Sequence, residues 1–358
     1  GRFAETSFVP VLMNVMFILA MVLAHHIGWD MGYALSITVP LTGVAQLSLM
    51  LYAVRRAGFR LQIKRPRLTP ELKRLALIAA PAVLAGGVMQ INLLVGRQVA
   101  SFTESAVAWL SYADRLYQLP LGVVGIAIGV VLLPDLSRRL SAGDEAGGRD
   151  SFNRGTEFAL ILTLPAAVAL VALAHPLVSV LYERGAFDAA DTKSTALALA
   201  VYGVGLPAFV LQKVLQPLYY AREDTRRPFH YAVMSMLVNA GLAISFMPII
   251  GFLASAFATS FSAWVMVMQL WRGARKMGDA AKLDARLLDR LPRIILACFA
   301  MLLVLAVIYQ PLEEMITQQS WRYLALFALV FGGMTSYGLA GLMFGAFRLN
   351  DLGRLLRR

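Results

Sequence analysis

Ten stretches of the 358-residue sequence are each about 20 residues long and almost entirely apolar, which is the length an α-helix needs to cross the hydrocarbon core of a membrane. A water-soluble domain could not bury so many such stretches. We therefore predict an all-α, polytopic membrane protein with ten transmembrane helices. The predicted spans are Phe8–Ile27, Met31–Tyr52, Leu75–Val95, Ala106–Leu133, Phe158–Leu181, Ser194–Tyr220, Phe229–Ile250, Phe252–Trp271, Ile294–Leu312 and Tyr323–Phe347.

The composition agrees with this fold class. Only 15% of the residues are charged and 59% are hydrophobic, whereas about 25% of the residues in a soluble globular domain are charged. The single cysteine, Cys298, cannot form a disulfide bond within the chain. A disulfide-stabilised secreted fold is therefore excluded.

The basic residues are distributed unevenly between the two sides of the predicted membrane. Of the 33 Lys and Arg residues, 27 lie in the end segments and loops of one side and four lie on the other side. Cytoplasmic loops retain the positive charge in membrane proteins, so both ends of this chain are predicted to be cytoplasmic. The charge is spread over every inner loop, so we expect no nucleic-acid partner.

The longer basic loops divide the spans into groups of two, six and two. The first loop covers residues 57–74, and the second covers residues 272–293. The chain begins with Gly1 and not with Met, and we expect no signal peptide in it. We expect it to be a piece of something longer.

The fourth predicted span carries two adjacent charges, Asp114 and Arg115. A charge near the bilayer centre costs about 2.5–3.5 kcal/mol on insertion scales, so it needs a partner or a cavity. Steps of three and four residues put six small or polar residues on the same helix face, which we call the Arg115 stripe. Its members are Ser111, Arg115, Gln118, Gly122, Gly125 and Gly129.

Two interpretations of Arg115 are open. It could form a structural ion pair, or extend its head group toward the membrane surface. Alternatively it could bind an anion, because a guanidinium group holds phosphate through two parallel hydrogen bonds. Asp114 lies about 100° from Arg115 around the helix axis, so we expect it to reach Ser111, Gln118 or a neighbouring helix.

The sixth span contains a second intramembrane cation, Lys213, on one stripe with Gln216. Lys213 could extend toward the inner surface or face a cavity. Arg97 is predicted to anchor the outer end of the third span, with a gate role as the alternative. Glu157, at the inner end of the fifth span, is predicted to be solvated.

No pattern in the sequence indicates enzyme chemistry. The four histidines are scattered, and neither a zinc-binding helix motif nor a phosphate-binding loop is present. We predict that the chain is not an enzyme and has no metal site.

Several longer runs resemble the lipid II flippase family (MurJ/MviN) of the multidrug/oligosaccharidyl-lipid/polysaccharide exporter superfamily. The most specific are Tyr112-Ala113-Asp114-Arg115-Leu116 and Arg222-Glu223-Asp224-Thr225-Arg226-Arg227-Pro228. The resemblance implies fourteen helices, in two six-helix lobes around a cavity plus two C-terminal helices. Residues 1–56 would then end the first lobe, 57–74 would form a cytoplasmic linker, 75–277 the complete second lobe, and 278–358 the pair with a lipid-tail groove.

The resemblance also implies a function: flipping of lipid II to the outer leaflet of the bacterial cytoplasmic (inner) membrane by alternating access. Arg115 would engage the diphosphate, with Asp114 beside it. We take Ser111, Gln118, Lys213 and Gln216 as further candidate substrate-binding residues. The expected partners are lipid II, membrane lipids and cell-wall synthesis proteins.

No cofactor is expected, and coupling to the membrane potential or to a cation is left open. Grounds for a sodium site are weak: Asn239 and Thr259 sit where polar ligands are expected, but the third and seventh spans lack an intramembrane carboxylate. The alternatives to lipid II flipping are a related exporter of another polyprenyl-linked saccharide, a drug/cation antiporter, and a non-transporting scaffold.

Overall fold

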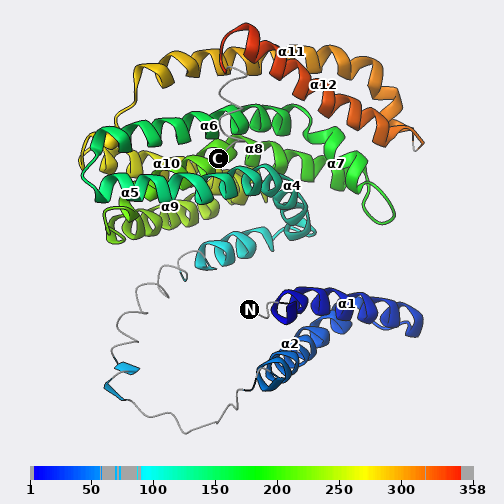
Figure 1. Cartoon of the computed structure of the whole chain (residues 1–358). Coiled ribbons are helices and arrows are strands. Elements are labelled where there is room, and N and C mark those ends of the chain that lie inside the picture. Colours follow the sequence, from blue (N-terminus) through cyan, green and yellow to red (C-terminus); the bar gives the residue numbers. More distant parts are fainter. Residues whose placement is uncertain are drawn as a thin grey trace. The chain divides into compact units, whose positions relative to one another are not determined.

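The secondary structure is helical, apart from one isolated bridge between Arg184 and Phe187, in the part of the chain that the structure describes. The computed structural model describes residues 4–56, 58, 69–70, 72–73, 87, 90–318 and 320–347. The chain divides into two compact units, Gly1–Ala76 and Leu77–Arg358 (Figure 1). The predicted all-α membrane fold is confirmed.

The first unit is a pair of packed helices, α1 (Ala4–Ile27) and α2 (Met31–Arg56). Gly28 makes the turn between them with φ of +72°, a conformation that glycine adopts at little cost. Both predicted N-terminal spans are therefore helices that end within a few residues of the expected positions.

The second unit is built around one long helix, α8, which packs against α4, α6, α7 and α10, while α9 packs on α10. The helices α11 and α12 lie side by side, and α11 rests on α6 (Figure 1). The bounds of these elements are α4 (Ala106–Ala127), α5 (Leu133–Ser141), α6 (Glu145–Ala172), α7 (Ala174–Tyr182), α8 (Ala189–Tyr220), α9 (Arg226–Ile250), α10 (Leu253–Ala274), α11 (Ala285–Thr317) and α12 (Arg322–Met343).

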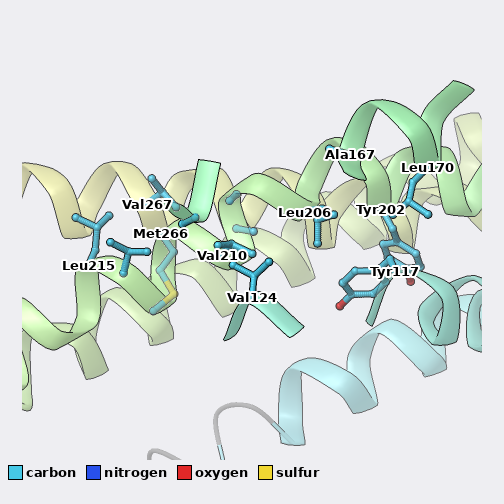
Figure 2. Packing of buried hydrophobic residues seen from close by; sticks show 14 of the residues in the cluster. Tyr117, Val124, Ala167, Leu170, Tyr202, Leu206, Val210, Leu215, Met266 and Val267 are labelled. Carbon is cyan, nitrogen blue, oxygen red and sulfur yellow. The ribbon is translucent and has the colours of Figure 1, made fainter. Parts of the chain in front are cut away.

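Small residues on α8 let its neighbours approach closely. A Cβ atom added to Gly203 would lie 3.3 Å from the Ala167 carbonyl oxygen of α6, and one added to Gly205 would collide with the Ser260 hydroxyl of α10. Around these contacts, side chains such as Leu206 are fully buried (Figure 2). Small residues at helix contacts are typical of proteins whose helices associate within lipid.

The predicted fourth span differs from a single straight helix. It runs as α4 to Ala127, continues as one π-helical turn at Ile128–Leu132, and resumes as α5. Pro134 explains the π turn, because it lacks the N–H that would bond to the carbonyl four residues earlier, and its ring crowds that carbonyl. The α4 helix therefore ends six residues before the end of the span that we predicted.

The predicted fifth span is broken as well. Leu173 separates α6 from α7 with φ and ψ of −104° and 17°. Pro176 cannot donate the hydrogen bond that would continue the ladder to Ala172, so the first helix ends there. Of the other spans, Leu75–Val95 lies largely outside the described residues, and residues 90–100 are helical.

Eight helices in the described ranges are long and apolar enough to cross a membrane. They overlap every predicted span except the third and the fourth, and the fifth only as far as Ala172. Ten spans therefore stays a prediction, although a multi-pass membrane protein is established.

The prediction for Glu157 is wrong, because this residue is buried rather than solvated. Only 4% of its surface is exposed, and its carboxylate forms salt bridges with Arg154, Arg286 and Arg290. Arg154 also pairs with Asp284, which caps the start of α11. The α11 helix therefore starts nine residues before the predicted span, and this Glu157 cluster ties it to α6.

The short helix α5 is tied to α6 at the end of the bundle where basic residues gather. Asp135 accepts hydrogen bonds from the Ser151 hydroxyl at 2.5 Å and from Arg139 Nε at 3.0 Å. Partial burial acts to raise the pKa of Asp135, but the Ser151 hydrogen bond and the two nearby guanidinium groups outweigh it and lower that pKa. The carboxylate thus stays charged and holds the two helices together.

Candidate functional site

The Arg115 stripe lies on the side of α4 that the rest of the second unit leaves uncovered. The opposite face, including Ala113 and Leu116, is buried against the bundle. As a result Ser111, Arg115 and Gln118 are exposed within this unit. The spacing that we used to place them on one face is realised in the structure.

Aromatic packing fixes the rotation of α4. Tyr117 packs against Tyr202 with ring centroids 5.1 Å apart, and against Phe209 at 5.6 Å. Both partners belong to α8, and Figure 2 shows Tyr117 and Tyr202 lying together between the two helices. With this cluster buried, the residues about half a helical turn away must face outward.

Arg115 presents its guanidinium group without a direct partner. In the ranges that the structure describes, it forms no hydrogen bond and no salt bridge within 4.0 Å. The nearby acid, Asp114, is half-buried and accepts a hydrogen bond from the Gln118 amide. Asp114 therefore pairs with Gln118, which is one of the partners that we predicted for it. The Arg115 guanidinium is left available to bind another group.

Arg97 is a second cation near Asp114. It lies near the end of the helical residues 90–100, is exposed, and is close enough to Asp114 to interact with it electrostatically. Two guanidinium groups are therefore near one carboxylate, and neither forms a salt bridge with it among the described residues. The sequence signal was the cation at the end of the third span, but nothing in the spacing could show which helix it approaches.

Lys213 lies against the glycine half of the Arg115 stripe. A Cβ atom added to Gly125 would be 3.1 Å from Cδ and 3.2 Å from Cε and Nζ of Lys213. The lysine is exposed, and Gln216 is partly buried one turn further along α8. The structure therefore brings the cation of the sixth span to the same face as Arg115, although the two residues were found on different helices.

Ser111 is placed on the stripe but its hydroxyl is used locally. Its Oγ donates a hydrogen bond of 2.6 Å to the Val107 carbonyl of the same helix. It therefore contributes a polar surface beside Arg115, with the oxygen lone pairs still able to accept a hydrogen bond.

The two residues considered for a sodium site, Asn239 and Thr259, each donate a hydrogen bond within the protein, while the Asn239 side-chain oxygen is buried without a partner among the described residues. The Asn239 amide donates to Asn92, and the Thr259 hydroxyl donates 2.8 Å to the Ser255 carbonyl. Over the described residues, no group of three or more His, Cys, Asp or Glu side chains could hold a metal ion.

The chemistry that this face offers is anion binding. A guanidinium group is always charged and presents five N–H donors in a planar fork that matches a phosphate or carboxylate. Lys213 provides a second, movable cation, and Gln118 and Ser111 provide neutral polar groups. These groups suit holding an anionic group.

Comparison with known proteins gives consistent matches. A sequence profile described as "Lipid II flippase MurJ" covers residues 1–332. The chain is 40% identical over 363 residues to a probable lipid II flippase MurJ of Rhizobium meliloti, covering all of this chain and 68% of that protein. It is 36% identical over 360 residues to the probable lipid II flippase MurJ of Vibrio cholerae, covering 98% of this chain and 67% of that one.

A second Rhizobium relative shows how much of such proteins this sequence spans. The chain is 45% identical to the probable lipid II flippase MurJ of Rhizobium tropici over 273 residues, which is 51% of that protein. The chain thus spans between half and about two-thirds of these relatives.

Among solved structures, "Lipid II flippase MurJ, inward closed conformation" superposes with a TM-score of 0.74. It is 23% identical and the match covers 96% of this chain and 68% of that one. At this identity the match establishes the fold only.

Proposed function

This chain belongs to the lipid II flippase MurJ family, and we propose that a full-length protein carrying it moves lipid II from the inner to the outer leaflet of the bacterial cytoplasmic membrane. The observation that carries this proposal is the exposed guanidinium of Arg115, which has no hydrogen-bond or salt-bridge partner among the described residues and lies on a polar face of α4, in the predicted fourth span. Such a group is costly in hydrocarbon, so its position requires a wet surface and an anionic partner.

The physical problem is to carry a diphosphate-sugar head group across about 30 Å of hydrocarbon. The polyprenyl tail can remain in the lipid throughout. A cavity between two lobes, lined by the Arg115 stripe, would shelter the head group while the lobes rock between inward and outward openings. Residues 75–277 would form one lobe, and residues 278–358 would guide the tail.

Each candidate residue has a distinct part in this proposal. Arg115 binds the diphosphate through its fork, and Lys213 compensates the remaining negative charge. Asp114, held by Gln118, keeps Arg97 and Arg115 on the same side and competes weakly with the substrate. Ser111 and Gln216 provide hydrogen-bonding surface along the path.

We propose no covalent step and no cofactor. A membrane potential that is negative inside would favour outward movement of an anion by about 2.3 kcal/mol per charge per 100 mV. Both ends of the chain would be cytoplasmic, as the distribution of basic residues predicts. Partners among the cell-wall synthesis proteins stay a prediction.

The test is translocation by the full-length protein in liposomes that contain fluorescent lipid II. A membrane-impermeant reductant bleaches only the outer leaflet, so we expect the protein to expose the inner-leaflet fluorophores over time. Liposomes without protein, and liposomes with fluorescent phosphatidylcholine, are the controls. The same bleaching curve with and without protein would contradict the proposal.

A further inference from the structure

A basic cavity of about 410 Å³ lies where α9 begins and α10 ends. It is separate from the Arg115 stripe, which belongs to α4. Its lining residues are Arg227, Tyr231, Gln269, Arg272, Gly273 and Lys276. We call it the α9–α10 cavity.

Two of its cations have no acid beside them. Arg272 lies in the last turn of α10, and Lys276 lies in the turn that follows the helix, two residues past its end at Ala274. Both are exposed, and neither side chain forms a hydrogen bond or a salt bridge with any residue that the structure describes. The third cation, Arg227, is paired with Asp224 at 3.3 Å. The cavity therefore carries an excess of positive charge.

The floor of the cavity is polar and held in place. Gly273 has no Cβ, and one added there would collide with the hydroxyl groups of Tyr219 and Tyr231. The Tyr219 hydroxyl donates 2.5 Å to the Leu270 carbonyl, and the two tyrosine rings pack edge to face. This fixes the position of Tyr231 in the cavity wall.

One hydrogen-bonding group in the wall is unsatisfied. The side-chain oxygen of Gln269 is buried and has no partner among the described residues. Leaving a buried acceptor without a partner costs about 1–3 kcal/mol. A ligand that carried a hydroxyl group beside its negative charge would satisfy both the amide and the cations.

The cavity is also at the right depth for a lipid head group. Arg226 starts one candidate membrane span, and Ala274 ends the next. The opening therefore lies at the ends of two adjacent candidate spans, where we expect the helices to leave the hydrocarbon. Basic pockets between helices at this level are suited to anionic head groups.

We propose that the α9–α10 cavity binds a phosphate ester, the group offered by an anionic glycerophospholipid and by soluble phosphate esters. The depth of the cavity favours the lipid. Arg272 and Lys276 bind the phosphate, and Gln269 accepts a hydrogen bond from a hydroxyl of the head group. This site goes beyond the proposed flipping function, because it does not involve Arg115.

The test is a titration of the full-length protein in neutral detergent, followed by native mass spectrometry. Phosphatidylglycerol, phosphatidylcholine and glycerol phosphate are the three probes. We expect phosphatidylglycerol to bind more tightly than phosphatidylcholine. Arg272→Ala and Lys276→Ala should each weaken its binding about tenfold, because each removes a charge-assisted hydrogen bond.

Arg275→Ala is the matched control, since it removes the same charge from the same helix end but from a residue outside this cavity. It should change the affinity less than about twofold. Equal weakening by Arg275→Ala, or equal affinity for the two lipids, would overturn the proposal by showing a diffuse electrostatic effect. Tight binding of glycerol phosphate would support the phosphate site and assign it to a soluble ester.

Arg115→Ala separates this site from the flipping site. If the two are independent, this variant keeps the affinity for phosphatidylglycerol and loses translocation. If it loses both, the bound lipid occupies the Arg115 stripe and the α9–α10 cavity is not the site.

Discussion

Replacing Arg115 with alanine should abolish lipid II translocation by the full-length protein. The loss of one partner from a desolvated charge pair costs about 2–5 kcal/mol, which is about 30-fold to about 5,000-fold in affinity. Arg115→Lys should recover only part of the lost affinity, because an ammonium group lacks the planar fork of hydrogen-bond donors. The bleaching assay in liposomes measures the translocation rate of each variant.

The control for this prediction is Leu119→Ala. Leu119 is one turn from Arg115 on α4 and is 67% exposed, so its truncation removes no packing in the described bundle and no charge. Its variant should translocate at the rate of the unmodified protein. If Arg115→Ala also kept that rate, the guanidinium would not be the phosphate ligand.

Replacing Glu157 with alanine should destabilise the protein by about 3–5 kcal/mol, because it removes the buried carboxylate with which the buried Arg290 and two partly exposed arginines pair. Glu157 and Arg290 are both more than 90% buried, so water cannot replace the lost ion pair. The expected result is a markedly lower midpoint of thermal unfolding in detergent. The loss should also loosen α11 from α6, since the Glu157 cluster joins them.

Asp150→Ala is the matched control for this second prediction. Asp150 pairs with Arg154 at 3.5 Å, but its side chain is 65% exposed. An exposed pair contributes about 0–1 kcal/mol, so this variant should unfold near the original temperature. If Glu157→Ala and Asp150→Ala lowered the midpoint of thermal unfolding equally, burial would not determine how much the Glu157 cluster contributes to stability.

Hydropathy and spacing were sufficient to predict most of the fold. Long apolar runs locate the helices because each must satisfy its backbone hydrogen bonds within the segment. The face that carries Ser111, Arg115 and Gln118 also followed from steps of three and four residues. The positions of the helices and the residues on one helix face depend on neighbours along the chain, so they can be predicted from the sequence alone.

The features that sequence reasoning missed depend on contacts between distant segments or on single backbone groups. The break at Leu173 and the π turn before Pro134 lie inside continuous apolar runs, where hydropathy carries no signal. The burial of Glu157 requires α11, which begins 128 residues later in the chain. Likewise, the approach of Lys213 to Gly125 depends on how α8 packs against α4.

The central claim is that the Arg115 stripe lines a water-filled cavity, and thiol labelling at Gly122 tests it most directly. Gly122 is on the stripe two turns from Arg115, and a side chain added there would meet no atom within 4 Å. The native thiol of Cys298 is buried and can be replaced by serine. Val123→Cys, about 100° around the helix and 68% exposed within this unit, is the matched control.

We predict that a membrane-impermeant maleimide modifies Gly122→Cys in the full-length protein, that lipid II slows this modification, and that Val123→Cys stays unmodified. If Gly122→Cys were as unreactive as Val123→Cys, the stripe would face lipid, and the proposed role of Arg115 would be wrong.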